Sequence, residues 1–184
     1  MKRLGIVLGI AAGLVVVAAL VLLVLGQRAD AGLLKGTVEI ARRPEDLFPW
    51  VNDPEKIKLW VGGLVEVRSE TPGPRAVGTR EVWVMDDPNL GRRIEVTGDI
   101  TALEPDKLVS ARISMPGAFE GESTATLTDA GPGLTRVDQV GRFTYTSWLA
   151  RLLEPIVTSQ ARKKLVADLA RLKEQSENAA TTGR

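Results

Sequence analysis

The clearest pattern in the chain is an uninterrupted apolar run near its beginning. From Leu4 to Leu25 every residue is Leu, Ile, Val, Ala or Gly. A helix rises about 1.5 Å per residue, so this run is long enough to cross a hydrocarbon core of about 30 Å. It predicts a transmembrane helix over residues 4–25, preceded by a basic cap over residues 1–3 and followed by a linker over residues 26–35.

A cleaved signal peptide is the alternative interpretation of the same run. Lys2 and Arg3 would form its basic region, and Ala29-Asp30-Ala31 resembles a cleavage site. The apolar part of a signal peptide is usually about 7–15 residues long, which favours an uncleaved anchor here. The positive-inside rule then favours a single-pass membrane protein whose soluble domain lies on the extracytoplasmic side.

Glycines recur at every fourth position inside the predicted transmembrane helix, at Gly5, Gly9 and Gly13. Residues with this spacing share one helix face and allow two helices to approach closely. They are therefore candidates for a homodimer contact. The competing explanation is that Gly is common in membrane helices in general.

Beyond the linker, the pattern changes to short strands and two short helices. Alternation over 37–41 predicts a first strand. Pro44 begins a short helix, and Asn52-Asp53-Pro54 ends it and caps a second helix over 55–60. Turn residues then separate six more predicted strands, over 65–69, 79–85, 92–103, 108–115, 119–128 and 134–145. Short strands joined by tight turns predict an antiparallel sheet.

The last predicted element is a long helix with Pro155 in its first turn. An apolar stripe at a spacing of three or four residues defines it. The stripe consists of Leu153, Val157, Ala161, Leu165, Leu169 and Leu172. Residues 179–184 are predicted to form a disordered tail.

The order of these elements resembles the SRPBCC superfamily, which includes START domains and polyketide cyclases/dehydrases and has the helix-grip fold. The resembling segments are residues 40–51, 53–60, 77–80 and 165–173. The resemblance implies an α+β domain over residues 36–178, in which about seven antiparallel strands curve around the C-terminal helix. It also implies a cavity for an apolar ligand between the sheet and that helix.

Alternation along the strands and the helical stripe select the candidate residues for that cavity. The predicted ligand-binding residues are Trp60, Trp83, Phe119, Gln139, Phe143, Tyr145, Val157, Ala161 and Leu165. A concave apolar lining with few polar groups is typical of a small-molecule site. An ordinary filled core has the same pattern and is the competing interpretation.

Composition removes several classes of function. The chain has no Cys and no His, which excludes disulfides, thiol nucleophiles, imidazole catalysis and His-ligated metals, and we expect no cofactor. Lys and Arg number 24 against 23 Asp and Glu, so no basic excess favours nucleic acid as a partner. Of the carboxylates, Glu81 shares the face of Trp83 and could enter the cavity mouth, whereas Glu120 and Glu122 are predicted on the solvated outer face.

Three hypotheses for function follow. The favoured one is a membrane-tethered binding module for a membrane lipid or another hydrophobic small molecule. The second is an enzyme of the cyclase or dehydratase type that uses a cavity carboxylate or Tyr145 as acid or base. The third is a membrane-anchored protein-interaction domain without a ligand. The absence of His and Cys favours the non-enzymatic alternatives.

Overall fold

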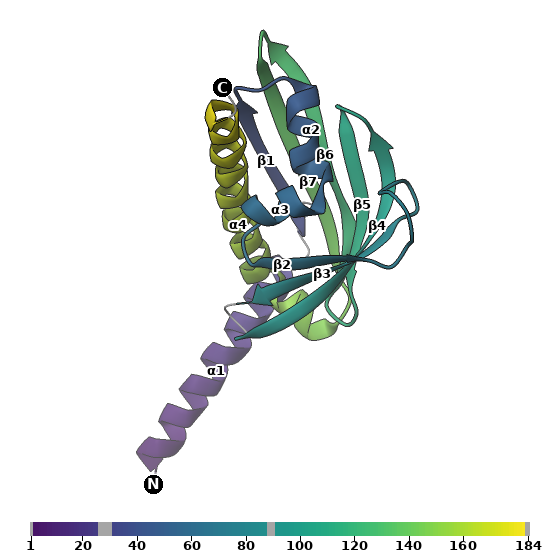
Figure 1. Cartoon of the computed structure of the whole chain (residues 1–184). Coiled ribbons are helices and arrows are strands. Elements are labelled where there is room, and N and C mark those ends of the chain that lie inside the picture. Colours follow the sequence, from purple (N-terminus) through teal and green to yellow (C-terminus); the bar gives the residue numbers. More distant parts are fainter. Residues whose placement is uncertain (1, 26–30, 88–90, 183–184) are drawn as a thin grey trace.

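The computed structural model describes residues 2–25, 31–87 and 91–182 (Figure 1). Four helices and seven strands form within these ranges. In chain order they are α1 (Lys2–Leu25), β1 (Leu33–Ile40), α2 (Pro44–Asn52), α3 (Pro54–Trp60), β2 (Leu64–Ser69), β3 (Arg80–Asp87), β4 (Arg92–Glu104), β5 (Leu108–Met115), β6 (Phe119–Gly131), β7 (Leu134–Tyr145) and α4 (Trp148–Thr182).

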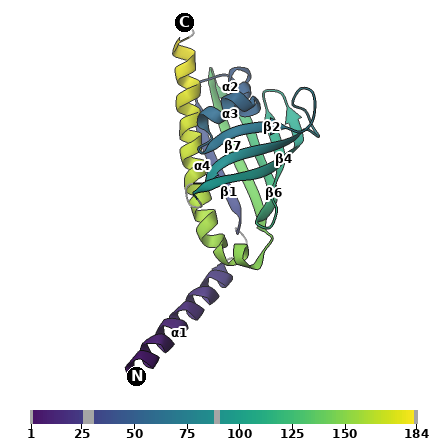
Figure 2. The same ribbon diagram turned by 60° about the horizontal axis from the view of Figure 1, so that its bottom comes forward.

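The seven strands form one antiparallel sheet in the order β1-β7-β6-β5-β4-β3-β2. From β2 to β7, consecutive strands pair with one another, and β1 pairs with β7 to form one edge of the sheet. Figures 1 and 2 show the sheet curving strongly, with α4 running beside β1 and the short helices α2 and α3 placed over one end. This arrangement confirms the predicted helix-grip fold.

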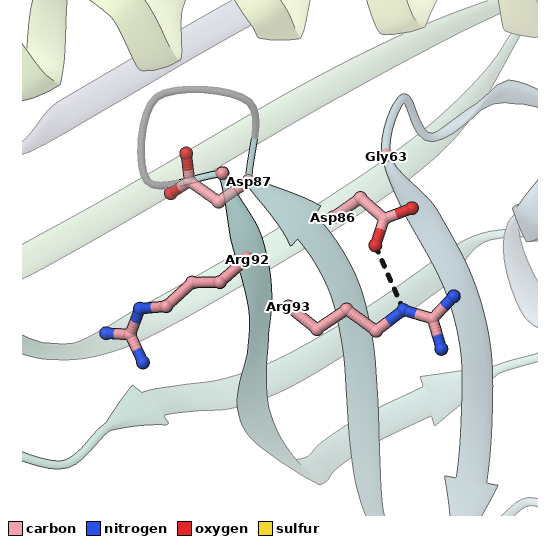
Figure 3. Close-up of a pocket in the computed structure, with 6 residues that line it drawn as sticks. Gly63, Asp86, Asp87, Arg92 and Arg93 are labelled. Atoms are coloured by element: carbon pink, nitrogen blue, oxygen red, sulfur yellow. Dashed lines mark hydrogen bonds and ion pairs between the residues drawn. The ribbon is translucent and has the colours of Figure 1, made fainter.

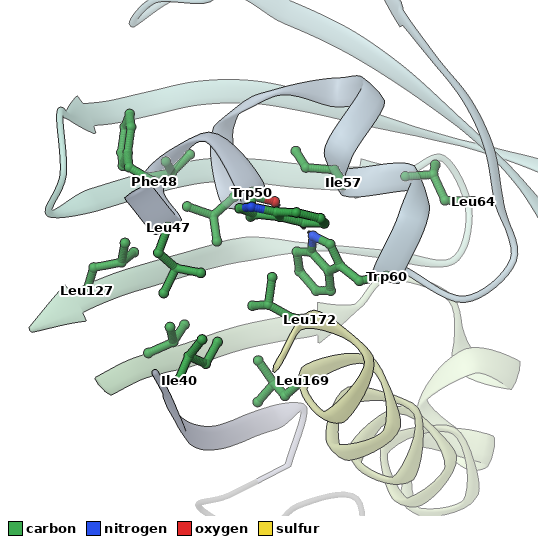
Figure 4. Close-up of a cluster of buried hydrophobic side chains, with 13 residues drawn as sticks. Ile40, Leu47, Phe48, Trp50, Ile57, Trp60, Leu64, Leu127, Leu169 and Leu172 are labelled. Carbon is green, nitrogen blue, oxygen red and sulfur yellow. Dashed lines mark hydrogen bonds between the residues drawn. The ribbon is translucent and has the colours of Figure 1, made fainter. Parts of the chain in front are cut away.

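One end of the domain holds a fully packed core (Figure 4). It joins side chains from α2, α3, α4 and the ends of β1, β6 and β7, and its most deeply buried members are Ile40, Leu47, Val137 and Leu172. The indole of Trp60 donates a hydrogen bond of 2.8 Å to the carbonyl of Trp50, which satisfies its one polar atom. The packed end therefore provides much of the hydrophobic stabilisation of the fold.

A glycine sets the close contact between α4 and the sheet. A Cβ atom placed on Gly36 of β1 would lie 2.6 Å from Leu169 Cδ1 and 3.2 Å from Leu165 Cδ2. Both leucines belong to the predicted stripe of α4, and Leu169 is buried. The missing side chain at Gly36 thus lets the helix lie directly on β1.

The largest differences from the predicted boundaries concern β1 and α4. Strand β1 begins at Leu33, so residues 33–35 belong to the sheet and not to the linker. Helix α4 begins at Trp148, because the Ser147 hydroxyl accepts a hydrogen bond of 3.1 Å from the Ala150 amide and caps the helix. Pro155 therefore lies about two turns inside α4. The helix also continues to Thr182, through most of the predicted tail.

Helix α1 projects away from the sheet and contacts α4 (Figure 2). Its side chains are described for residues 11–22 and 24, and within the part of the chain so described no helix is long and apolar enough to cross a membrane. A Cβ atom on Gly13 would meet nothing within 4 Å. The side chains of the basic cap and the surroundings of Gly5 and Gly9 are not described, and residues 26–30 of the predicted linker and cleavage site lie outside the described residues.

Candidate functional site

The concave face of the sheet carries a small enclosed cavity. Its volume is about 20 Å³ and its walls come from β3, β4, β5 and the preceding loop: Arg75, Glu81, Trp83, Val96, Gly98, Ala111 and Ile113. A cavity of this size holds about one water molecule, whereas small-molecule pockets measure about 300–1,000 Å³. This part of the concave face is therefore nearly filled by its own side chains.

A buried ion pair forms the polar wall of that cavity. Arg75 Nε lies 2.8 Å from Glu81 Oε1, and Arg75 Nη2 lies 3.0 Å from Glu81 Oε2. The Trp83 indole donates to the same Oε2 at 3.1 Å, and Arg75 Nη1 donates to the Asn52 carbonyl at 2.9 Å. Glu81 is 2% exposed. Arg75 thus ties the loop before β3 to the junction of α2 and α3.

This geometry corrects the expected role of Glu81. The side chain does face the concave side with Trp83, but it is buried in an ion pair and does not lie free at a cavity mouth. Both of its oxygens accept hydrogen bonds from a guanidinium in a bidentate arrangement. A carboxylate held in this way is poorly placed to remove a proton from a ligand.

Burial decreases along the concave face toward the end where α4 begins. At the packed end, Leu127 of β6 and Val137 of β7 are buried. Further along the same faces of these two strands, Phe119 and Phe143 are only partly buried. Their rings meet edge to face at a centroid distance of 5.6 Å. These aromatic side chains therefore present apolar surface at this end of the concave face. We call it the open end, and Phe119, Phe143 and Tyr145 mark it on β6 and β7.

One flank of α4 borders the same region. Asp168 accepts a hydrogen bond from the Gly62 amide, and Arg171 donates to the carbonyl of Trp60, so this flank faces α3. Ala161 and Val157 precede Asp168 by two and three helical turns and share its flank. Ala161 is half-buried and Val157 is 42% exposed. This flank of α4 thus carries further apolar surface.

A second polar cluster lies at the open end, between β7 and α4. The Tyr145 hydroxyl lies 3.1 Å from the Thr158 hydroxyl, and the Gly32 amide donates to Glu154 Oε1 at 2.9 Å. Glu154 and Thr158 are each 2% exposed. Burial raises the pKa of Tyr145 above its ordinary value of about 10; the hydrogen bond with Thr158 acts in the opposite direction, and the charge of Glu154 adds to the rise.

The predicted ligand-binding residues fall into several groups. Trp60 belongs to the packed core. Trp83 and Gln139 lie on the concave face, where Trp83 bonds to Glu81 and the Gln139 amide donates to the Ser123 hydroxyl at 2.7 Å. Of the remaining six, Phe119, Phe143 and Tyr145 neighbour one another on the paired ends of β6 and β7. Leu165 packs against the core beside Gly36, and Val157 and Ala161 lie on the flank of α4 described above.

Sequence analysis missed three residues of the two polar clusters. Arg75 stands in a loop that has no periodic pattern. Glu154 and Thr158 each follow by one residue a position of the predicted stripe, and the structure buries them while Leu153 and Val157 stay exposed. A spacing of three or four residues does not by itself determine which of two adjacent helix faces is buried. The sequence contained one signal for their burial: Glu154 and Thr158 are polar residues four positions apart, next to the apolar stripe.

A larger hollow of about 540 Å³ lies beside the tip of the β3–β4 hairpin (Figure 3). Its lining is Gly63, Asp86, Asp87, Gly91, Arg92 and Arg93, with Arg93 Nε 3.1 Å from Asp86 Oδ1. Four of these six residues are charged, and Asp86, Arg92 and Arg93 are exposed, which does not suit an apolar ligand. Among the described residues, no group of three or more His, Cys, Asp or Glu side chains is placed to hold a metal ion.

The curved seven-stranded sheet and the long C-terminal helix form the helix-grip fold that the resemblance to the SRPBCC superfamily implied. The family described as "Polyketide cyclase / dehydrase and lipid transport" matches residues 33–177, and the chain belongs to this family. The matched region begins at the first residue of β1. No curated protein matches the chain.

Several solved structures share the fold at low sequence identity. A conserved protein from Geobacillus kaustophilus has a TM-score of 0.66 at 10% identity, covering 80% of this chain and 96% of that one. Protein NE0264 from Nitrosomonas europaea has a TM-score of 0.65 at 14% identity, covering 84% and 99%. DynU16, a putative protein in the dynemicin biosynthetic locus, has a TM-score of 0.59 at 16% identity, covering 83% and 48%.

Proposed function

We propose that this chain is a membrane-tethered module that binds a lipid or another hydrophobic small molecule between the sheet and α4. The decrease in burial along β6 and β7 is the observation that carries the proposal. The packed end buries Leu127 and Val137, whereas Phe119 and Phe143 keep part of their apolar surface exposed, and Val157 of α4 is exposed as well. Covering such surface is favourable by about 25 cal/mol per Å². The family to which the chain belongs includes lipid transport in its description.

The ligand lies at the open end in this proposal. The enclosed cavity beside Glu81 has room for only about one water molecule, so it does not hold a lipid-sized molecule without rearrangement. The open end offers aromatic rings from β6 and β7 and aliphatic side chains from α4. A hydrophobic molecule placed there would contact both the sheet and the helix.

The membrane part of the proposal rests on α1 and on the beginning of α4. Helix α1 carries no charged residue from Leu4 to Leu25. Trp148 is 76% exposed at the start of α4, and Leu149 beside it is also exposed. Indoles are enriched at membrane–water interfaces, and α4 contacts α1. We therefore propose that the open end of the domain lies next to the bilayer. The basic residues Lys2 and Arg3 before the apolar run favour the extracytoplasmic side for the domain.

Photolabelling tests the proposed binding surface. The full chain in lipid nanodiscs is irradiated with a decanol that carries a diazirine, and labelled peptides are mapped by mass spectrometry. Labels are expected on α4 near Val157 and on β6 and β7 near Phe119 and Phe143. Ala161→Phe fills the space beside Val157 and should reduce this labelling to background.

Ala170→Phe is the matched control, because Ala170 is an exposed alanine on the same helix. Circular dichroism checks that both variants keep the wild-type fold. Labelling spread evenly over the domain, or unaffected by Ala161→Phe, would contradict a binding surface at the open end.

A further inference from the structure

We infer that the buried carboxylate of Glu154 binds the polar end of the ligand, and that this polar end is a hydrogen-bond donor, a hydroxyl or an ammonium group, on an apolar chain. The inference rests on the proposed function and narrows it to one chemical class of amphiphile. It predicts that amphiphiles with an anionic end, such as fatty acids, are rejected.

An unpartnered oxygen at Glu154 is the first observation. Glu154 Oε1 accepts a hydrogen bond from the Gly32 amide, but Oε2 has no partner among the residues that the structure describes. The side chain is 2% exposed. Buried polar atoms in proteins are almost always hydrogen-bonded, so this oxygen is available to accept a hydrogen bond from a bound group.

The position of Glu154 is fixed by backbone geometry. Gly32 has a φ of +67°, and a Cβ atom there would lie 2.0 Å from the Phe143 carbonyl oxygen, so only glycine fits. The Gly32 carbonyl accepts a hydrogen bond of 3.0 Å from the Phe143 amide while its own amide donates to Glu154. This link holds the carboxylate beside the strand that carries Phe143.

The surrounding groups define what Glu154 can accept. Thr158 follows Glu154 by one helical turn and contacts the hydroxyl of Tyr145, which shares the concave face with Phe143. Arg151 is exposed, and its Nε donates to the backbone carbonyl of Tyr145 at 3.0 Å. A carboxylate only accepts hydrogen bonds. It therefore favours a hydroxyl or ammonium group, and it repels a second anion.

Tyr145 provides a probe of this site, because it is the single tyrosine of the chain. Incorporating 3-fluorotyrosine gives one ¹⁹F resonance from the full chain in nanodiscs. Three probes of equal chain length are titrated: decan-1-ol, decylammonium and decanoate. We expect saturable shifts of the resonance with decan-1-ol and decylammonium and at least roughly tenfold weaker binding of decanoate, since charge-assisted hydrogen bonds are the strong ones.

A pair of isosteric variants assigns the selectivity to Glu154. Glu154→Gln should weaken decylammonium binding at least roughly tenfold relative to wild type. The difference between the affinities for decylammonium and decanoate should therefore become smaller. Glu174→Gln removes an exposed carboxylate from the same helix and should change nothing. The comparison of the three probes on the wild-type chain remains decisive if Glu154→Gln does not fold.

The outcomes separate this inference from the proposed function. Decanoate binding as tightly as decan-1-ol and decylammonium would overturn the role of Glu154 and leave hydrophobic binding intact. Equal selectivity in wild type and folded Glu154→Gln would also overturn it. No saturable shift with any of the three probes, together with no mapped photolabelling, would overturn both the inference and the proposed function.

Discussion

Single residues decide the electrostatics of the concave face. The ion pair between Arg75 and Glu81 is buried, bidentate and further bonded to Trp83 and Asn52. Removing two charges from water costs several kcal/mol for each ion, and close geometry with additional hydrogen bonds offsets that cost. The pair therefore depends on both partners being present.

Arg75→Met should be strongly destabilising, because it leaves Glu81 buried without its cation. We expect the free energy of unfolding to fall by about 3–5 kcal/mol. Chemical denaturation followed by tryptophan fluorescence measures the change. Arg68→Met breaks the exposed pair with Glu95 and should cost at most about 1 kcal/mol. Equal losses in the two variants would show that burial does not strengthen the dependence on Arg75.

Tyr145 should titrate above the ordinary pKa of tyrosine, chiefly because it is partly buried. Its raised pKa favours the protonated hydroxyl in the folded state. The corresponding stability is complete below the unfolded pKa of about 10 and is lost as pH rises through the folded value. Glu154→Gln should lower the pKa of Tyr145, since it removes a nearby negative charge. Tyrosinate absorbance during a pH titration measures both values. A pKa unchanged by Glu154→Gln would contradict the coupling.

Sequence patterns predicted some of these residues and not others. The Asp53 cap was predicted from Asn52-Asp53-Pro54 and is confirmed, because its carboxylate accepts from the Glu55 amide. A helix cap depends on residues that are close together in the chain, so it can be predicted from the sequence. Arg75 and Glu81 meet through tertiary packing across a loop. The burial of Glu154 and Thr158 depends on how α4 is rotated about its own axis. The apolar stripe alone does not determine that rotation.

Among the elements, α4 and β1 form the contact that shapes the concave side. The helix lies on Gly36, and the strand face beside it leads to the packed core. The turn residues predicted where one strand ends and the next begins. The predicted bounds of β5 and β7 agree with the structure. The start of α4 was predicted from Pro155, but the Ser147 cap places it earlier.

Gly36→Ala should destabilise the domain. The added methyl group would press on Leu169, which is buried and has little room to move, and we expect a loss of about 1–3 kcal/mol. Gly98→Ala is the matched control within a strand, because the nearest atom to a Cβ there is Trp83 Nε1 at 3.8 Å. It should be neutral or stabilising by up to about 1 kcal/mol. Thermal unfolding compares the two variants, and a tolerated Gly36→Ala would argue against a tight contact between α4 and β1.

At the scale of the whole molecule, an apolar helix is joined to a helix-grip domain whose open end lies near it (Figure 2). The sequence predicted this order of elements, because each element has its own local pattern. It did not predict how far the concave face is filled. That property depends on how side chains from the seven strands and α4 meet in space. The structure shows a nearly filled region beside Glu81 and a partly exposed region beside Phe143.

Native mass spectrometry of the full chain, released from nanodiscs, tests the central claim that the open end holds a hydrophobic small molecule. We predict one retained molecule per chain in wild type and in Ala170→Phe, and its loss in Ala161→Phe. Extraction of the retained molecule then identifies its polar end. A bare chain mass for all three proteins, or a molecule retained equally by Ala161→Phe, would contradict the account.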